Sequence, residues 1–400
     1  TLSLDKKSLW IELKPFIKVL IMLNNKYLSV VANPPYMGQK NMNEELKVYV
    51  NKNYPDSKSD LFAVFMEVCI RLSSKNSYMG MINQQSWMFL SSFEKLRQRF
   101  LDNYFISSML HLGAGTFKEI SGEVVQSTAF ILGNFVSNIG GRYHRLIDVD
   151  GDNKENSFIN KSKEFKNISQ SNFSKIPGSP IAYWVSEKWY SVFSNSKPLL
   201  NYADIRQGMA TSDNDRFLKY WFEVTKIKIG FDYANKDEAI TSKCKWFPYN
   251  KGGGFRKWYG NGEYVVNWEN DGFEIKNFKN SVIRNEAYYF RGSFSWSFIS
   301  SGSFGIRFTP TGYLFDVQGS SVFVKDNDKY LLGYLNSKVT YKLLNILNPT
   351  LSIQVGNISN LPIIFCNTEI QKGIIEKAQG NIDITKTDWD VKETGWNFNR

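Results

Sequence analysis

Residues 33–36 read Asn33-Pro34-Pro35-Tyr36, and they directly follow an apolar run that reads Tyr27-Leu28-Ser29-Val30-Val31-Ala32. These residue types fit one chemical task, the methylation of an exocyclic amine on a nucleobase. The N6 amine of adenine is a weak nucleophile because its lone pair is delocalised into the ring. A site must therefore accept hydrogen bonds from both of its N–H groups. The Asn33 side-chain oxygen can accept one of them, and the carbonyl of Pro34 the other.

The rest of the tetrapeptide suits the same task. Two prolines fix the backbone and remove competing N–H donors, so the loop is rigid before a substrate arrives. Tyr36 can stack on a base that has been turned out of the duplex. Turn chemistry alone would also permit an Asn-Pro-Pro turn that only ends a strand. We predict that Asn33, Pro34, Pro35 and Tyr36 form a catalytic loop, and that Asn33 and Pro34 also contact the methyl donor.

Segments beyond this loop resemble the γ-type N6-adenine DNA methyltransferases. In that resemblance, residues 59–67 match a helix start, 78–90 a strand and loop, 94–97 a helix, and 122–132 a closing hairpin. More narrowly, several blocks resemble the BREX phage-defence methyltransferases of the PglX type: residues 206–211, 245–259, 301–305 and 388–390. The resemblance covers nearly the whole chain.

The resemblance implies an α/β fold in two parts. Residues 1–147 would be the C-terminal half of a Rossmann-like methyltransferase sheet, and 148–178 a linker or ordered surface excursion. Residues 179–365 would form a mixed α+β, β-rich target-recognition domain like that of the TaqI-like enzymes. The tail 366–400 would dock on a further C-terminal region through its tryptophans. The implied cofactor is S-adenosyl-L-methionine, and the implied partners are double-stranded DNA and other phage-defence subunits.

One expected feature does not appear in the sequence. A Rossmann-like methyltransferase binds its cofactor with a Gly-rich turn after its first strand, and no glycine precedes Gly38. We therefore expect an internal piece of a longer protein that lacks most of the cofactor pocket. The alternative is a permuted enzyme whose cofactor turn is Gly113-Ala114-Gly115. No ribose-binding acid follows that turn at the usual distance of roughly 20 residues.

Composition narrows the classes of partner and site. The 49 basic residues exceed the 38 acidic ones, for a formal charge of +11, which favours a polyanionic partner such as DNA. The isolated cysteines Cys69, Cys244 and Cys366 and only two histidines argue against a zinc site and against a His-based triad. No apolar run reaches membrane-spanning length. We expect a cytoplasmic protein with no metal.

The clearest candidate for a DNA contact is the stretch 245–259, which has six aromatic, four basic and no acidic residues. Backbone N–H groups of a glycine loop flanked by basic side chains can hold phosphates. The simpler interpretation is a β-rich core in which half of these aromatics are buried. We expect DNA contacts from Arg206 and Arg307 and from the residues of this stretch that follow: Lys251, Gly252, Gly253, Arg256, Lys257, Trp258 and Tyr259.

Two other functions remain open from the sequence. The first is a DNA-binding recognition fragment that is inactive on its own, because the cofactor turn is absent. The second is a fused methyltransferase-endonuclease, for which Glu274-Ile275-Lys276 superficially fits a nuclease motif. No partner carboxylate strand precedes that motif, and the absence of a cysteine near Asn33 argues against cytosine-C5 chemistry.

Overall fold

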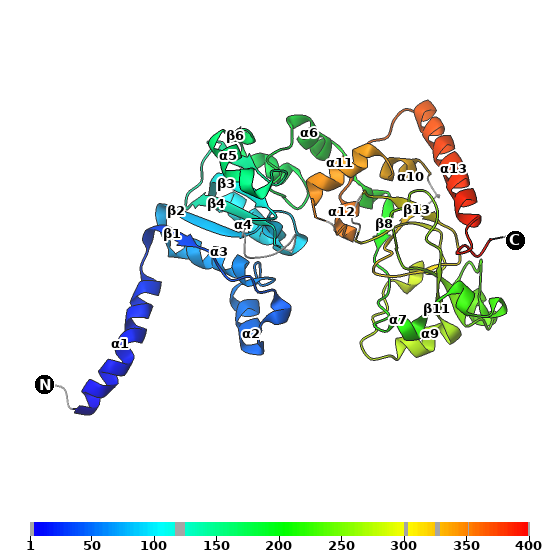
Figure 1. Ribbon diagram of the computed structural model, residues 1–400, viewed down its shortest axis with the longest axis horizontal. Helices are drawn as coiled ribbons and strands as arrows, with labels where there is room; N and C mark the ends of the chain where they lie inside the picture. The colour runs from blue at the N-terminus through cyan, green and yellow to red at the C-terminus, as the bar shows by residue number, and fades with distance from the viewer. Residues whose placement is uncertain (1–3, 117–124, 300–302, 325–328, 351, 399–400) are drawn as a thin grey trace. The chain divides into compact units, whose positions relative to one another are not determined.

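The computed structural model describes residues 4–116, 125–299, 303–324, 329–350 and 352–398 (Figure 1). The chain forms two compact units, which divide between Ser194 and Asn195. This division falls later than the end of the expected linker at residue 178. Parts of two blocks used for the family resemblance, residues 122–124 and 301–302, lie outside the described residues.

The first unit is built on one mixed six-stranded sheet in the order β1-β2-β4-β3-β5-β6. Strand β1 pairs with β2 in parallel and β3 with β5 in parallel, whereas β4 is antiparallel to both β2 and β3. Its elements are α1 (Leu4–Asn24), β1 (Tyr27–Ala32), α2 (Glu44–Asn53), α3 (Leu61–Leu72), β2 (Ser73–Gln84), α4 (Glu94–Asn103), β3 (Phe105–Gly113), β4 (Ser127–Gly133), β5 (Gly141–Arg145), α5 (Lys154–Ile159), β6 (Glu164–Ile168) and α6 (Glu187–Asn195).

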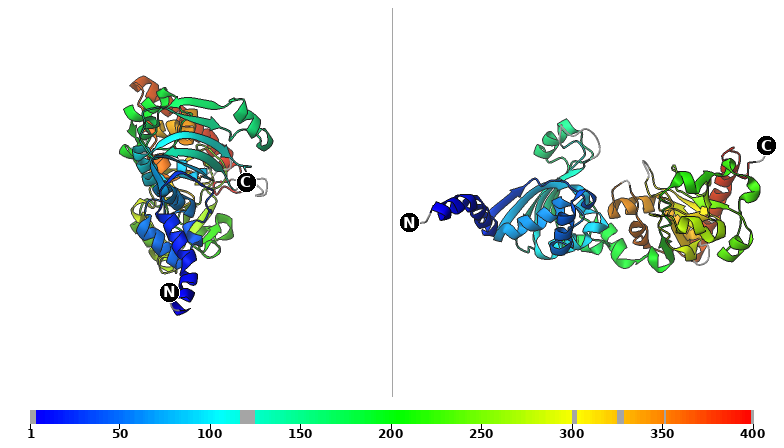
Figure 2. Two further views of the ribbon diagram at one scale, coloured as in Figure 1. Left: turned by 90° about the vertical axis from the view of Figure 1, so that its left-hand side faces the viewer. Right: turned by 90° about the horizontal axis from the view of Figure 1, so that it is seen from below.

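The sheet buries one face, as the alternation of its residues requires. Met79, Met81, Met109 and Phe130 point into a core that also contains Phe62 and Met66 of α3 and Leu96 and Phe100 of α4. Figure 2 shows this twisted sheet from two further sides. The Rossmann-like α/β class predicted from the sequence is confirmed, because parallel pairs alternate with packed helices.

Strand β1 lies at an edge of this sheet, since the topology gives it β2 as its neighbour among the described strands. Leu28 and Val31 are each 80% exposed. Helix α1 also exposes large apolar side chains: Leu9, Trp10, Ile11, Leu13, Phe16, Val19, Leu20, Ile21, Met22 and Leu23. An unpaired strand edge beside exposed apolar side chains is a surface prone to association.

The segment expected as a linker or surface excursion is ordered and belongs to the first unit. Residues 148–178 contain α5 and β6, and β6 extends the sheet by pairing antiparallel with β5. Helix α5 is short, and it places Phe158 and Ile159 beside the exposed face of the sheet. The excursion interpretation therefore describes this segment better than a free linker.

The second unit consists of short strands and peripheral helices. Two four-stranded sheets, β14-β10-β11-β9 and β13-β12-β15-β8, and a small pair β16-β7 form its framework. Its elements are β7 (Lys197–Pro198), β8 (Ala203–Arg206), α7 (Asn214–Phe217), β9 (Leu218–Tyr220), α8 (Lys236–Thr241), β10 (Trp246–Asn250), β11 (Tyr264–Asn267), α9 (Glu269–Lys276), β12 (Ser293–Trp296), β13 (Ile306–Thr309), β14 (Leu314–Phe315), β15 (Ser321–Val324), α10 (Lys329–Leu335), α11 (Lys338–Leu347), α12 (Val355–Ser359), β16 (Pro362–Ile363) and α13 (Thr368–Asp390).

The C-terminal tail docks on the second unit itself. Trp389 is buried at the end of α13, and the Trp396 ring packs against Phe231 and Tyr313 at centroid distances of 5.3 and 5.6 Å. Trp221 Nε1 donates to the carbonyl of Thr394 at 2.8 Å. The expectation that these tryptophans dock on a further C-terminal region is therefore corrected. Within the unit, Trp396 already packs against two aromatic rings and Trp389 against Arg256.

No helix within the described ranges is both long enough and apolar enough to cross a membrane.

Candidate active-site loop and nucleic-acid interface

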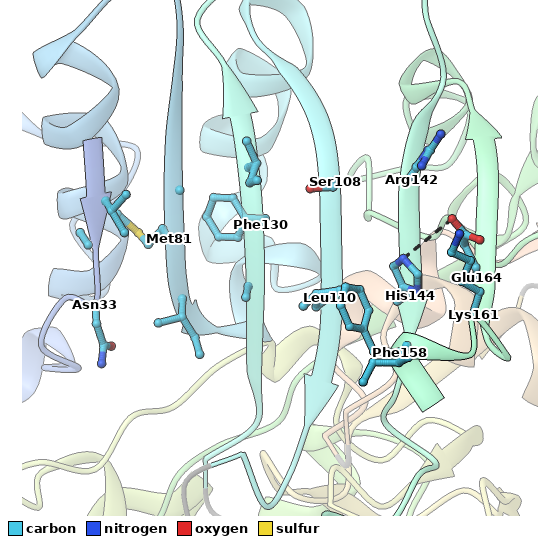
Figure 3. Close-up of a pocket in the computed structure, with 17 residues that line it drawn as sticks. Asn33, Met81, Ser108, Leu110, Phe130, Arg142, His144, Phe158, Lys161 and Glu164 are labelled. Carbon is cyan, nitrogen blue, oxygen red and sulfur yellow. Dashed lines mark ion pairs between the residues drawn. The ribbon is translucent and has the colours of Figure 1, made fainter. Parts of the chain in front are cut away.

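The predicted catalytic loop leaves β1 at the end of the strand (Figure 3). Asn33 and Pro35 are exposed, Pro34 is buried and Tyr36 is half-buried. The buried Pro34 anchors the middle of the loop, while the Asn33 amide stays accessible to a substrate. The structure thus brings the four predicted catalytic residues together at the carboxyl end of a parallel strand, where ligands bind in open α/β sheets.

Tyr36 is fixed by an aromatic contact beneath it. Its ring meets Phe62 edge to face, with the centroids 6.0 Å apart and an interplanar angle of 81°. Burial raises the pKa of the Tyr36 hydroxyl, so this group stays protonated at neutral pH. Its Oη is buried near the Ser127 side chain, which opposes this shift of the pKa. The contact with Phe62 holds the ring at a set angle beside Asn33.

Asp60 joins the loop to helix α3. Its Oδ1 accepts from the N–H of Met37 at 2.9 Å and from the N–H of Phe62 at 3.3 Å. The same carboxylate therefore caps the helix and holds the residue that follows Tyr36. Burial raises the pKa of Asp60, and the backbone N–H donors of Met37 and Phe62 oppose that shift. The sequence placed Asp60 at a helix start but did not indicate its contact with the loop.

A buried polar network ties the neighbouring strand ends together. His111, on β3, contacts Gln85 Oε1 through Nε2 at 2.6 Å and Tyr183 Oη through Nδ1 at 3.0 Å. Because an amide oxygen only accepts, Nε2 carries the proton and Nδ1 accepts from the tyrosine. Gln85 in turn donates to Gln126, which precedes β4. Burial, assisted by the nearby Arg145, lowers the pKa of His111 to about 3, so the ring is neutral.

The face of the sheet opposite to α3 and α4 carries an open cavity of about 830 Å³ (Figure 3). Apolar residues such as Val31, Ile82, Leu110 and Ile131 line most of it, and Asn33 lies at one side. The far side is polar, where His144 Nε2 faces Glu164 Oε1 at 4.0 Å. Arg142 and Lys161 lie beside this pair. The predicted catalytic loop therefore borders a wide apolar cavity through Asn33.

The turn at Gly113 and Gly115 has the wrong context for the permuted cofactor site. It follows β3, and the next described element is its antiparallel neighbour β4, whereas a cofactor turn joins a strand to a helix. Both glycines have positive φ, 68° and 69°. A Cβ on Gly113 would lie 3.0 Å from the Ile147 side chain, and Lys154 Nζ binds the carbonyl of Ala114. Packing within the unit accounts for this turn.

In the second unit, the loop after β10 contains the first group of predicted DNA contacts. Lys251 Nζ lies 2.7 Å from Asp316 Oδ2 and 3.2 Å from Asn214 Oδ1. Gly252 and Gly253 have φ values of +88° and +109°, which disfavour other residues. These positive φ values agree with the glycine loop expected here. The Lys251 ammonium is paired with the buried carboxylate of Asp316.

The next four predicted contacts face inward. Arg256 pairs with Asp388 at 3.1 Å and stacks over Trp389 at 4.8 Å. Lys257 Nζ donates to the carbonyl of Asn336 at 2.7 Å, and burial lowers the pKa of Lys257. Trp258 is half-buried, and its backbone pairs with β13 through bonds to Ile306 and Phe308. Tyr259 is buried. These contacts engage the charged groups within the unit, and the phosphate-binding role of the group stays a prediction.

Arg206 and Arg307, also predicted to touch DNA, differ from each other. Arg206 pairs with Asp204 at 2.7 Å, and its hydrogen bond to Tyr288 Oη raises its pKa. Arg307 is only 1% exposed, and burial lowers its pKa to about 10. Its Nε and Nη2 have no hydrogen-bond partner among the described residues. Arg307 is therefore a core residue in this structure, while Arg206 keeps a half-buried surface position.

The residues considered for a nuclease are occupied by ion pairs. Glu274 Oε1 binds Arg216 Nη2 at 2.5 Å, and the hydrogen bond from Arg216 lowers the pKa of this carboxyl. Lys276 contacts Asp271 at 2.8 Å and Glu286 at 2.6 Å. This arrangement is that of surface ion pairs and does not support an endonuclease.

Comparison with known proteins gives a consistent result. The model of the Eco57I restriction-modification methylase family matches residues 3–117. The adenine-specific methyltransferase BrxX of Escherichia coli O9:H4 (strain HS) is 41% identical over 407 aligned positions, covering 100% of this chain and 32% of the relative. The adenine-specific methyltransferase PglX of Lacticaseibacillus casei (strain Zhang) is 41% identical, covering 97% of this chain and 33% of the relative.

Solved structures show the same fold. The type IIL restriction-modification enzyme MmeI, in a complex with DNA, aligns with a TM-score of 0.61 and 13% identity, covering 90% of this chain and 49% of that chain. A nuclease-deletion mutant of the type ISP enzyme LlaGI, with a DNA substrate mimic, aligns with a TM-score of 0.54 and 12% identity, covering 89% and 41%. At such low sequence identity, these structural similarities are evidence of a shared fold only.

The chain spans about one third of the length of the curated relatives that it matches. The resemblance noted in the sequence is confirmed: along its whole length, this chain is related to the adenine-specific methyltransferases of the BrxX and PglX type.

Proposed function

We propose that the natural protein containing this chain transfers a methyl group from S-adenosyl-L-methionine to N6 of adenine in double-stranded DNA. The observation that carries the proposal is the loop Asn33–Tyr36, which is held at the carboxyl end of β1 by Pro34, Phe62 and Asp60. The names of the relatives, adenine-specific methyltransferases, support the same reaction. A role on DNA agrees with the expected cytoplasmic location and with the charge of +11.

The loop residues can divide the work as follows. Asn33 Oδ1 and the carbonyl of Pro34 accept hydrogen bonds from the two N–H groups of the amine. These bonds draw the nitrogen lone pair out of conjugation and toward the methyl donor. Tyr36 stacks on the extruded adenine with the ring face that does not meet Phe62. The bound sulfonium supplies an electrophilic methyl group. Positioning of the amine against the methyl group therefore supplies most of the rate enhancement of methyl transfer. The rigid anchoring of the loop matters as much as the hydrogen bonds that it forms with the amine.

A narrower role follows for the 400 residues by themselves. The chain, including its second unit, has a fold similar to that of a restriction-modification enzyme solved with DNA. In the first unit, β1 is the edge strand of the described sheet, on the side where a cofactor-binding strand would be expected to pair. We propose that the isolated chain binds DNA as a recognition fragment and has little methyltransferase activity. Other phage-defence subunits remain candidate partners of the natural protein, as the family resemblance implies.

The test is an analysis of the product. The natural protein is incubated with duplex DNA and a methyl-labelled donor, and the DNA is digested to nucleosides that are separated and identified by mass. We expect the label in N6-methyldeoxyadenosine. Label in N4-methyldeoxycytidine or 5-methyldeoxycytidine would reject the assignment of adenine as the substrate, and unlabelled DNA would reject the reaction.

A further inference from the structure

The loop of residues 251–255, here called the glycine loop, is held at almost every residue. Ser297 Oγ donates to the Gly253 carbonyl at 2.7 Å, and Asn261 Nδ2 donates to the Gly254 carbonyl at 2.8 Å. A Cβ on Gly252 would lie 2.5 Å from the carbonyl oxygen of Gln318, so the loop packs tightly against the segment after β14. Such anchoring on both sides gives the loop one defined shape.

This rigid loop presents an exposed aromatic side chain. Phe255 is 54% exposed, whereas four of the other aromatics of residues 245–259 are buried: Trp246, Phe247, Tyr249 and Tyr259. Ile299, which follows the Ser297 anchor, is also exposed. A Cβ on neighbouring Gly254 would meet nothing within 4 Å, so the backbone beside Phe255 is open to a ligand. A constrained loop therefore holds one apolar ring partly exposed to solvent.

Two other phenylalanines of this unit have similar exposure but different surroundings. Phe273 is 68% exposed on α9, among Glu269, Asp271 and Glu274. Phe222 is 56% exposed beside Glu223, and its ring already stacks flat on Tyr220, with centroids 5.3 Å apart. The acids near Phe273 are paired with Lys245, Lys276 and Arg216, so this ring lies in a charge-balanced environment, and one face of the Phe222 ring is already covered.

The charges around Phe255 differ from those two sites. The stretch 245–259 contains no acidic residue. The carboxylates that approach it are matched by bases, since Asp316 pairs with Lys251 and Asp388 with Arg256. A phosphate backbone can therefore approach Phe255 without meeting an unpaired negative charge from these groups. Of these three phenylalanines, Phe255 is the one whose own stretch has basic residues and no acidic residue, which suits a nucleic acid.

We propose that Phe255 is a base-contacting residue that places its ring against the bases of bound duplex DNA. The faces of paired bases are covered in a duplex, so the ring would contact them by inserting at a base step and unstacking it locally. A ring held by a rigid loop loses little conformational freedom on binding. The inference rests on the proposed DNA-binding function of this chain, and it adds the residue through which the second unit reaches the bases. The charged neighbours Lys251 and Arg256 then act mainly to hold the loop.

The test measures the affinity of the 400-residue chain for duplex DNA of randomised sequence. Phe255→Ala should weaken binding roughly tenfold, as expected for the loss of one stacking contact, and Phe255→Tyr should keep most of the affinity. The slope of affinity against salt should be the same for both variants as for the wild type, because no charge is removed. Phe273→Ala and Phe222→Ala are the matched controls, and both should bind like the wild type.

A second measurement reads the contact directly. With p-benzoyl-phenylalanine in place of Phe255, ultraviolet light should crosslink the chain to DNA, and the same group at Phe273 should not. Wild-type binding together with an unchanged Phe255→Ala affinity and no crosslink at residue 255 would overturn the inference. A wild-type chain that fails to bind DNA would reject the proposed recognition role itself. Melting curves of each variant establish that the compared proteins are folded.

Discussion

At the scale of single residues, the site depends on how firmly a short loop is held. The tetrapeptide Asn33-Pro34-Pro35-Tyr36 was recognisable because its residue types are uncommon together and follow an apolar strand. Its support was not recognisable, because the contact between Asp60 and the N–H of Met37 joins residues 23 positions apart. A sequence pattern shows a helix cap at Asp60, but it cannot show which loop returns to share that cap.

The first prediction concerns this shared carboxylate. Asp60→Ala removes the acceptor for Met37 N–H and Phe62 N–H, so the loop should shift and the methyl-transfer rate of the natural protein should fall roughly 10- to 100-fold. Asp60→Asn keeps an acceptor oxygen and should recover most of the rate. Both variants should bind DNA normally. A full rate for Asp60→Ala, in a variant shown to be folded, would mean that the loop needs no anchor.

The second prediction concerns pH. His111 has a pKa of about 3 in the folded chain and 6.5 in the unfolded chain, so the unfolded chain binds more protons below pH 6.5. Stability from this residue is complete above pH 6.5 and is lost as the pH falls toward 3. Between pH 7 and pH 5 the loss should be roughly 2 kcal/mol. His111→Gln should flatten this dependence in denaturant titrations; an equally steep dependence in the variant would contradict the assignment.

The partners of the basic side chains are a feature that the sequence did not indicate. Charge and neighbouring glycines marked Arg256 and Lys257 as phosphate contacts, but Arg256 is matched by Asp388, which is 132 positions away, and Lys257 by the Asn336 carbonyl. Composition reports which charges exist and not which partners the fold supplies. The exposure of Phe255 could not be predicted for the same reason. Which aromatics of this stretch are buried depends on the two sheets around them, and a sequence pattern does not show that arrangement.

At the scale of elements, local patterns were more informative. The strand 27–32, the helix that begins after Asp60 and the antiparallel pair β3–β4 all occur where the sequence and the family resemblance placed them. Apolar spacing was less informative further along the chain. Leu331, Leu332, Leu335 and Val339 have helical spacing, but the chain breaks at Ser337, which caps α11, and Val339 is exposed. A capping serine outweighs apolar spacing there.

The third prediction belongs to the edge of the first sheet. Leu28 and Val31 are each 80% exposed on β1, so the isolated chain should self-associate through this edge. The double variant Leu28→Lys with Val31→Lys should shift the chain toward the monomer in sedimentation velocity. Ile227→Lys, at a position 84% exposed in the second unit, is the matched control and should change nothing. A wild-type chain that is monomeric at high concentration would contradict this prediction.

At the scale of the whole molecule, two units with separate tasks share one chain. The first carries the predicted catalytic loop, and the second carries two short sheets; the fold of the chain is similar to that of a restriction-modification enzyme solved with DNA. The family resemblance implied this division into two parts. It placed the boundary too early, because residues 148–178 add β6 to the first sheet, a pairing that requires knowledge of the register of β5.

The fourth prediction concerns the methyl donor. Strand β1 is the last described strand on its side of the sheet, and the Gly113 turn leads into an antiparallel strand. The 400-residue chain should therefore bind S-adenosyl-L-methionine very weakly in calorimetry, while the natural protein containing it should bind saturably. Saturable micromolar binding by the 400 residues would revive the permuted site at Gly113 and Gly115.

The central claim is that Asn33 activates the adenine amine, and one variant tests it most directly. Asn33→Ala in the natural protein should reduce methyl transfer to N6 of adenine by roughly 100-fold or more, because it removes an acceptor directed at the reacting nitrogen. Its affinity for duplex DNA should stay near that of the wild type. The control Asn51→Ala, which removes an exposed asparagine that contacts Gln39 at 3.1 Å, should methylate normally. Methylation by Asn33→Ala at a near wild-type rate, measured with a radiolabelled donor, would contradict the account.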